Sequence, residues 1–361
     1  MKERVVVAMS GGVDSSVAAA LLKKQGYEVI GLTMCFNLLD STRKKPACCG
    51  LGAIEDARRV AQKIGIRHYV LNMQKVLEEK VIKNFCQEYL GGRTPNPCVR
   101  CNQYLKFDYL LKKALSLDAR FLATGHYARI DRVQGTGYRV QKYLLKKGKD
   151  KQKDQSYFLY RLTQKQLKHI IFPLGDYTKA EVRKLAGEFA LPVADKIASQ
   201  EICFLPHTDY RGFLKERIKA KIKPGPIVDS QGKVLGQHKG VPFYTIGQRE
   251  GLGLALGFPV YITKIDPKNN QITVAKKEEA EKREFFVKEP HFIAKPIKKK
   301  IALKVRIRYN HPEAPAVILP QGRRLKVRFK KPQFAVTPGQ AAVFYAGDEV
   351  VGGGIIERAC G

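Results

Sequence analysis

One seven-residue string, SGGVDSS at positions 10–16, constrains the fold of this chain more than any other feature. It stands between an apolar run, 4–9, which predicts a buried strand, and a run, 15–25, which predicts a helix capped by Asp14 or Ser15. The glycines let backbone N–H groups face an anion, the serines add hydroxyl donors, and the helix adds its positive end. The string is neither a Walker A motif nor GxGxxG. It predicts a phosphate site, with the Asp14 carboxylate able to hold magnesium.

Strand and helix patterns alternate after this string, as expected for a parallel sheet covered on both faces. Strands are predicted at 28–34, 67–71 and 121–124, and helices at 53–64 and from a Thr178–Glu181 capping box to near Phe189. The fold class is therefore α/β, with an N-terminal doubly wound parallel sheet. We expect this first domain to span residues 1–205.

The sequence pattern changes after residue 206. A basic helix at 209–222 precedes hairpin-like segments such as GPIVDSQGKVLG and VYITKIDPKNNQITVA, which predict a small mixed or β middle domain at 206–283. A charged stretch at 276–284 leads into five short strand patterns. They predict a C-terminal β-barrel domain at 284–361.

Charge points to a polyanionic partner. The 361 residues hold 66 Lys and Arg against 33 Asp and Glu, a formal net charge of +33, and nucleic acid leads the candidates. Lys304, Arg306 and Arg308 alternate along one predicted strand and would line one face with charge, while Tyr309 could stack on a base. A second basic segment lies at 142–154.

Eight cysteines occur in a chain with no apparent export signal and no apolar run long enough to cross a membrane. We therefore expect a cytoplasmic protein with no membrane association, whose cysteines serve chemistry or metal binding. Cys98-x-x-Cys101 is half of a zinc motif, for which adjacent Cys48 and Cys49 would be poor partners. Pro95 and Pro97 argue against a helix N-terminus after Cys98, and hence against a thioredoxin-like pair. Three more cysteines are interpreted as structural or incidental: Cys35, Cys86 and Cys360.

The string SGGVDSS resembles the loop of the PP-loop ATP pyrophosphatase superfamily, which splits ATP into AMP and pyrophosphate. Five further strings, in order, are similar to the bacterial tRNA-specific 2-thiouridylase family: GRTPNPCVRCN, ATGHYAR, KDQSYFL, SQEICF and GVPFYTIGQREGLG. The resemblance implies ATP-dependent adenylation of C2 of the wobble uridine in the anticodon arm of tRNA. Sulfur would follow from a cysteine persulfide, supplied by a persulfide protein or a cysteine desulfurase relay.

The same resemblance implies roles for individual residues. Cys203 would carry the persulfide, and Cys101 would be the nucleophile that releases the sulfur and can close onto Cys203 as a disulfide. ATP would contact Ala8, Met9, Ser10, Gly11, Gly12, Val13, Asp14, Ser15, Met34 and Gly125, with Asp14 holding Mg²⁺. The target base would meet Asn96, Pro97 and Cys98, and the tRNA would meet His126, Lys153, Asp154, Gln155, Arg308, Tyr309 and Gln340.

Position 98 departs from the family, because many relatives have Asp where this chain has Cys98. An alternative mechanism follows, in which Cys98, Cys101 and Cys203 hold a [4Fe–4S] cluster that binds sulfide. Two rival functions also share features of the sequence. A PP-loop ligase of the argininosuccinate or GMP synthetase kind would need neither paired thiols nor this charge, and a non-catalytic RNA-binding module would not explain SGGVDSS.

Overall fold

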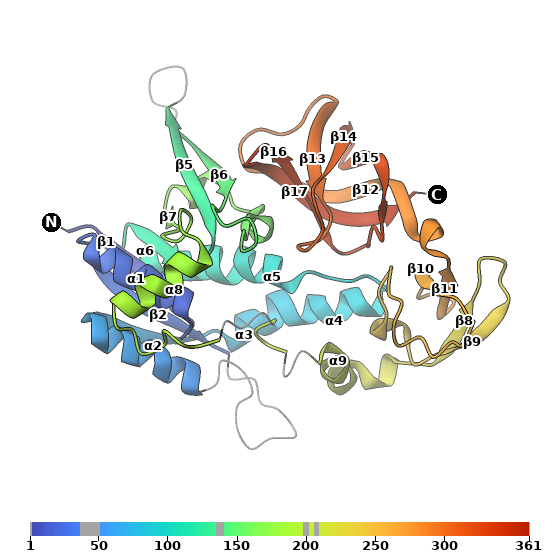
Figure 1. The fold of residues 1–361 in the computed structure, drawn as a ribbon, viewed down its shortest axis with the longest axis horizontal. Helices are drawn as coiled ribbons and strands as arrows, with labels where there is room; N and C mark the ends of the chain where they lie inside the picture. Colours follow the sequence, from blue (N-terminus) through green and yellow to red (C-terminus); the bar gives the residue numbers. More distant parts are fainter. Residues whose placement is uncertain (1, 37–50, 135–140, 198–201, 206–208, 361) are drawn as a thin grey trace. The chain divides into compact units, whose positions relative to one another are not determined.

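The computed structural model describes residues 2–36, 51–134, 141–197, 202–205 and 209–360 (Figure 1). The chain forms two compact units. The first comprises residues 1–81, 98–208 and 348–350, and the second comprises residues 82–97, 209–347 and 351–361. Cys48 and Cys49 lie outside the described residues, as do the first three residues of SQEICF.

The first unit is built on a five-stranded parallel sheet, which confirms the predicted fold class (Figure 1). Val5, Val6 and Val7 on the first strand are all fully buried, as a strand covered on both faces requires. The order is β3-β2-β1-β4-β7, with β1 at Arg4–Ala8, β2 at Glu28–Cys35, β3 at Arg67–Asn72, β4 at Phe121–Thr124 and β7 at Ile170–Ile171.

Helices cover both faces of this sheet. Val5 and Val7 pack in one core cluster with residues of α1 (Val13–Lys24), α2 (Leu51–Ile64) and α8 (Lys179–Glu188). Val6 and Leu122 point to the opposite face and are also buried, and α6 (Leu111–Leu115) contacts β4 there. The predicted capping box of Thr178 and Glu181 is present at α8.

The prediction for the start of the first helix was wrong. Helix α1 begins at Val13, and its N-cap is Gly12, with no side-chain cap. Ser15 and Ser16 lie inside the helix, and both hydroxyls donate to the Gly12 carbonyl, at 3.1 and 2.9 Å. A serine in the first turn of a helix can reach the carbonyl three or four residues back, so these hydroxyls are used within the loop.

Further elements of the first unit carry the candidate site. A hairpin of β5 (Ala128–Gln134) and β6 (Gln141–Lys147) follows β4. Helix α5 (Pro97–Arg100) leads into the π-helix η2 (Cys101–Leu110), and α5 begins one residue before the segment 98–208 of the first unit. A helix therefore does begin at Pro97, although Pro95 and Pro97 were expected to leave no helix N-terminus beside Cys98. Proline fits the first helical position. The remaining short helices are α3 (Gln74–Leu77), η1 (Glu78–Ile82), η3 (Ser156–Leu159) and α7 (Gln164–Leu167).

The second unit contains a four-stranded sheet in which both predicted hairpins are present. Its order is β10-β11-β8-β9, with β8 at Gly225–Val228, β9 at Val234–His238, β10 at Tyr261–Asp266 and β11 at Gln271–Ala275. The predicted basic helix is shorter than expected: α9 spans Tyr210–Ile218, and a 3-10 turn follows at Lys219–Lys221. Tyr210 stacks on Tyr89 of α4 (Lys83–Leu90), with ring centroids 5.3 Å apart, so α4 packs within this unit.

The predicted C-terminal barrel is also present. Strands pair in the order β12-β15-β14-β13-β16-β17, and β12 pairs again with β17, which closes the sheet on itself. Val305 and Ile307 are buried in the barrel core while Lys304 is exposed, as the predicted alternation requires. The strands are β12 (Glu281–Phe292), β13 (Ile301–Arg306), β14 (Ala314–Gln321), β15 (Arg324–Phe334), β16 (Ala341–Ala346) and β17 (Glu349–Ala359).

Over the described ranges of the chain, no helix has the length and apolar character that a membrane span needs.

Candidate functional site

The loop between β1 and α1 lies where the strand order reverses. β1 is flanked by β2 on one side and β4 on the other, so the carboxyl ends of β1 and β4 form the switch point at which open α/β sheets bind ligands. Gly11 adopts a φ of +70°, and a Cβ there would lie within 3.0 Å of the Ala53 backbone, so only glycine fits. The loop therefore directs the N-terminus of α1 into the switch point, which suits an anion.

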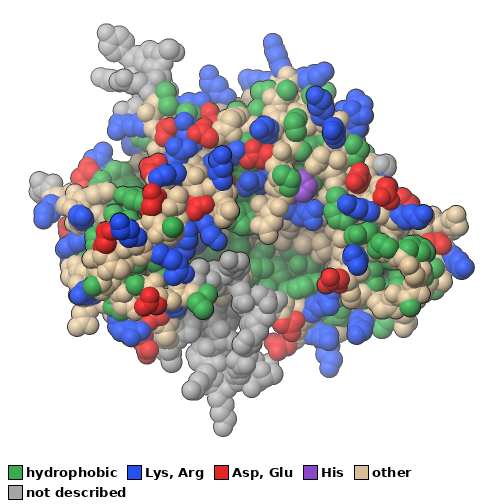
Figure 2. Space-filling view, in the orientation of Figure 1, with side chains coloured by type: hydrophobic (Ala, Val, Ile, Leu, Met, Phe, Trp, Pro, Cys, Tyr) green, Lys and Arg blue, Asp and Glu red, His purple; other side chains and the backbone are tan. Residues whose placement is uncertain are grey.

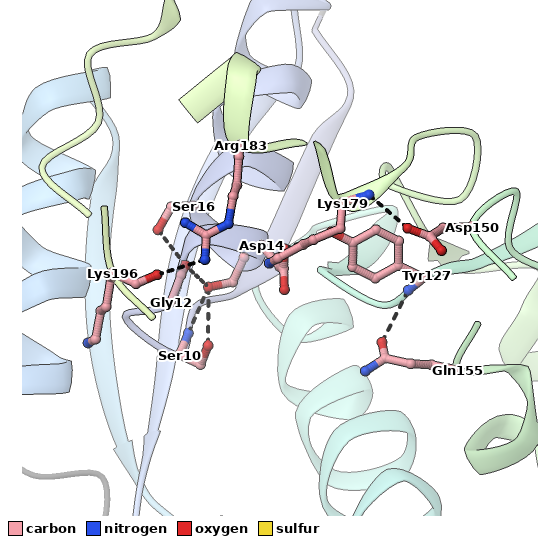
Figure 3. A network of polar contacts seen from close by, with 11 residues as sticks. Ser10, Gly12, Asp14, Ser16, Tyr127, Asp150, Gln155, Lys179, Arg183 and Lys196 are labelled. Carbon is pink, nitrogen blue, oxygen red and sulfur yellow. Dashed lines mark hydrogen bonds and ion pairs between the residues drawn. The ribbon is translucent and has the colours of Figure 1, made fainter. Parts of the chain in front are cut away.

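Asp14 is the acidic centre of this loop, and two side chains meet its Oδ1 atom (Figure 3). Lys179 Nζ, from α8, lies 2.5 Å away, and the Tyr127 hydroxyl donates at 2.8 Å. Burial, followed by the charge of Asp14, raises the pKa of Tyr127, so this phenol keeps its proton. Among the described residues no hydrogen bond reaches Asp14 Oδ2, which leaves that oxygen available to a cation.

Three basic side chains surround the loop, and the sequence alone did not single them out. Lys179 and Arg183 are four residues apart on α8 and therefore share one face of that helix. Lys196 Nζ donates to the Gly11 carbonyl at 3.0 Å and lies 2.5 Å from Asp56. Arg183 donates to the Lys196 carbonyl at 3.4 Å (Figure 3). The only available signal was the helix pattern after Thr178, which did not reveal what its face contacts.

Gly125 lies against the start of α1. A Cβ built on it would meet the carbonyl carbon of Asp14 and the nitrogen of Ser15, each at 2.8 Å. Met34 is half-buried and lies at the carboxyl end of β2, the strand that neighbours β1. The structure thus brings Gly125 to the SGGVDSS loop and sets Met34 at the same edge of the sheet.

The thiols of Cys101 and Cys203 are hydrogen-bonded partners, although they are far apart in the chain. This hydrogen bond, with a smaller contribution from the charge of Lys106, lowers the pKa of Cys101 to about 7. Burial raises the pKa of Cys98 to about 11. Cys203 is exposed and Cys101 is buried, so the pair joins a solvent-facing thiol to one whose pKa is lowered from the ordinary value.

The same cysteines do not fit a metal cluster. Within the described ranges, which include Cys98, Cys101 and Cys203, no group of three His, Cys, Asp or Glu side chains is arranged to hold a metal ion. The [4Fe–4S] alternative is therefore not favoured.

His126 is buried beside Lys106, the lysine whose charge also acts on Cys101. Its Nδ1 lies 2.6 Å from Thr124 Oγ1, and its Nε2 lies 3.4 Å from Lys106 Nζ. Burial, and then the charge of Lys106, lowers its pKa well below the ordinary value. His126 was predicted to meet tRNA, and only 8% of it is exposed here.

The predicted target-base residues follow a loop that is fixed within the second unit. Gln340 Nε2 donates to the carbonyls of Thr94 and Pro95, at 2.9 and 3.2 Å, and the Thr94 N–H donates to the Pro338 carbonyl at 2.9 Å. Gln340 was predicted to meet tRNA, and in this structure its amide is used to hold the chain just before Asn96. Asn96 is half-buried and Pro97 is buried.

Among the other predicted tRNA residues, Asp154 and Gln155 hydrogen-bond within the protein. Asp154 is 3% exposed and accepts from the backbone of Gly148 and Ser156, while Gln155 Oε1 accepts from the Tyr127 N–H. Lys153 is half-buried.

In the barrel, Arg308 is half-buried and donates to the Phe334 carbonyl at 3.0 Å, and Tyr309 is half-buried beside it. Lys and Arg side chains are spread over much of the face seen in Figure 2, in line with the net charge of +33.

A parallel sheet in this order, with an SGGVDSS loop at its switch point, defines a nucleotide-binding α/β protein of the PP-loop class. The family models that match describe a tRNA methyl transferase HUP domain at residues 3–207, a tRNA methyl transferase PRC-barrel domain at 211–276 and an aminomethyltransferase β-barrel domain at 282–356. Curated relatives with similarity along nearly the whole chain give the family: this chain belongs to the tRNA-specific 2-thiouridylases.

Three of these relatives illustrate the similarity. The tRNA-specific 2-thiouridylases of Caldanaerobacter subterraneus subsp. tengcongensis and Halothermothrix orenii are each 52% identical to this chain, over 99% of both chains. That of Pelotomaculum thermopropionicum is 51% identical, over 99% of this chain and 98% of its own. The recognition made from the sequence strings is therefore confirmed.

Proposed function

We propose that this protein transfers sulfur to C2 of the wobble uridine of tRNA at the expense of ATP, as a tRNA-uridine 2-sulfurtransferase. The observation that carries the proposal is the contact between the Cys101 and Cys203 thiols in the unit that also holds the SGGVDSS loop. A PP-loop ligase needs no such pair, and a non-catalytic RNA-binding module needs no such loop.

In the first step, O2 of the uridine attacks the α-phosphorus of ATP, and pyrophosphate leaves. N–H groups at the start of α1, together with Lys179 and Arg183, would stabilise the negative charge that develops on the departing phosphates. Asp14 Oδ2 would hold Mg²⁺, a cation that prefers carboxylate and phosphate oxygens and would neutralise the same charge.

In the second step, the terminal sulfur of a persulfide on Cys203 attacks C2, and AMP leaves with the former O2 atom. The uridine is then joined to Cys203 through two sulfur atoms. The Cys101 thiolate attacks the Sγ atom of Cys203, which forms a Cys101–Cys203 disulfide and releases the thiolate of 2-thiouridine. A cellular thiol reductant restores the pair, and a persulfide protein or cysteine desulfurase relay reloads Cys203. The charge of Lys106, which lowers the pKa of Cys101, would favour the thiolate for this attack.

The tRNA contacts remain as proposals: Asn96, Pro97 and Cys98 at the target base, with His126, Lys153, Arg308, Tyr309 and Gln340 at the tRNA. We also propose domain boundaries of 1–205, 206–283 and 284–361 and a cytoplasmic location.

One assay tests the function. The protein is incubated with ATP, a persulfide source and unmodified tRNA, and the products are analysed for AMP and 2-thiouridine. We expect AMP and 2-thiouridine in equal amounts from the wild type. We expect no 2-thiouridine from the Cys203→Ala variant. AMP without thiolated tRNA, in the presence of an amine or carboxylate acceptor, would identify a ligase instead.

A further inference from the structure

Both side chains that contact Asp14 have their backbones held by one short segment. This segment, residues 148–156, contains the string KDQ and is called here the lysine-rich turn. It follows β6 and lies within the first unit. Tyr127 and Lys179, the two partners of Asp14, come from places more than 50 residues apart in the chain, yet the turn bonds to each of them.

On the Tyr127 side, Gln155 forms two hydrogen bonds with one residue. The Tyr127 N–H donates to Gln155 Oε1 at 3.1 Å, and the Gln155 N–H donates to the Tyr127 carbonyl at 2.9 Å (Figure 3). A Cβ on Gly148 would lie 2.9 Å from the same carbonyl, so the turn passes directly over the Tyr127 backbone. The position of the Tyr127 ring, and hence of its hydroxyl at Asp14, depends on this contact.

On the Lys179 side, the contact is made by Asp150. Its Oδ2 accepts from the Lys179 N–H at 2.9 Å, at the first turn of α8 (Figure 3). Its Oδ1 accepts from the backbone of Gln152 and Lys153, at 2.9 and 3.2 Å. Lys149 Nζ adds an ion pair with Glu181 at 3.1 Å. These bonds attach the start of α8 to the turn, and the Lys179 ammonium extends from there to Asp14.

We propose that Asp150 and Gln155 are positioning residues of the ATP site, which act by holding Lys179 and Tyr127 against Asp14. The inference deepens the proposed function and rests on it, because it assigns the KDQ segment to the nucleotide end of the reaction. Asp154 is 3% exposed and accepts from the backbone of Gly148 and Ser156 inside this turn, and Gln155 Oε1 accepts from the Tyr127 N–H. If Gln155 acts through Tyr127, its function needs the acceptor oxygen Oε1 and does not need the N–H donors of the side-chain amide.

The conservative variant Gln155→Glu separates this role from direct contact with tRNA. A glutamate keeps the acceptor oxygen but adds negative charge and loses the amide donor. Positioning predicts that Gln155→Glu binds a non-hydrolysable ATP analogue within about twofold of the wild type, while Gln155→Ala binds it about fivefold more weakly, as expected for one lost hydrogen bond. Gln152→Ala, the same residue type three positions earlier and exposed, is the matched control and should bind like the wild type.

The measurement is the equilibrium affinity of each variant for the ATP analogue in the absence of tRNA. It therefore tests the positioning role even if tRNA thiolation is not observed. The affinity of each variant for tRNA is measured separately. If both Gln155 variants bind the analogue normally but lose tRNA affinity, with Gln155→Glu the weaker, Gln155 is a direct tRNA contact and the inference is overturned.

A double-mutant cycle tests the route through Tyr127. Tyr127→Phe removes the hydroxyl that donates to Asp14 and keeps the ring. If Gln155 acts through Tyr127, the double variant Gln155→Ala/Tyr127→Phe should lose clearly less affinity for the analogue than the sum of the two single losses. Strict additivity would overturn the route.

Discussion

Gly125 and Asp14 approach each other so closely that no side chain fits between them. A Cβ on Gly125 would lie 2.8 Å from the carbonyl carbon of Asp14, so the segment after β4 and the first turn of α1 are in direct contact. These are the two walls of the switch point at which the nucleotide is proposed to bind.

Replacing Gly125 by alanine should therefore weaken ATP binding without removing a polar group. The methyl group must displace the backbone of Asp14 and Ser15, and overpacking of this kind costs about 1–3 kcal/mol, or ~5- to 150-fold if the whole cost falls on affinity. Titration with an ATP analogue measures the change. Gly187→Ala is the control, because a Cβ there meets nothing within 4 Å and lies in α8. Normal ATP binding by Gly125→Ala would contradict the packing argument.

Asp14→Asn should lower AMP formation by about 100-fold or more while tRNA still binds. The substitution removes the charge that pairs with Lys179 and that would hold Mg²⁺. Release of AMP at saturating tRNA is the measurement, and a filter-binding assay with tRNA is the control. AMP formation at the wild-type rate would remove the loop from the adenylation step.

The reactivity of Cys101 should titrate near neutral pH. Because its pKa is lowered to about 7, the rate of its alkylation by iodoacetamide, limited overall by burial, should level off above that pH and fall progressively below it. Cys98, with a pKa raised to about 11, should stay unreactive until the solution is strongly alkaline. Mass spectrometry of the two peptides follows both. Cys203→Ala should move the Cys101 midpoint upward, since it removes the largest cause of the shift, and an unchanged midpoint would argue against the thiol contact.

Cys98→Ala should keep substantial thiolation activity with a persulfide donor, whereas Cys101→Ala and Cys203→Ala should abolish it. In the proposed sequence of steps only the latter two exchange sulfur. Formation of 2-thiouridine is the readout, with iron content of anaerobically purified protein measured alongside. Complete loss of activity in Cys98→Ala, together with about four iron atoms per chain, would restore the cluster mechanism.

Binding of tRNA should weaken steeply with salt, and Lys304→Gln should reduce the slope of log affinity against log salt by about one. Lys304 is exposed on β13, whereas Arg306 is partly engaged by Glu313 at 3.8 Å. Lys184→Gln on α8, where the lysine side chain is 81% exposed, is the control. A flat salt dependence in the wild type would refute the role given to the net charge.

Several features of this protein could be predicted from the sequence because they depend on local patterns. The run of valines at 5–7 is apolar at every position, so it predicted a strand buried on both faces. Thr178 and Glu181 stand at the spacing of a capping box, which is formed by residues of a single turn. The alternation of Lys304, Val305, Arg306 and Ile307 likewise follows from the two-residue period of a strand.

The start of α1 shows where local rules gave the wrong answer. Asp14 and Ser15 are good capping residues, but the glycines allow the helix to begin earlier, and Asp14 then meets Lys179 from far along the chain. Propensity ranks capping residues one at a time and does not include a tertiary partner.

What the sequence determined by itself was the identity of the chemical groups: a phosphate loop, two cysteines in recognisable strings and a large positive charge. Which of them meet was decided only by the tertiary structure. Lys179 and Arg183 reach the loop because α8 packs beside α1, and Cys203 meets Cys101 about 100 residues earlier in the chain. Such pairs depend on side-chain packing between distant segments, which leaves no periodic trace in the sequence.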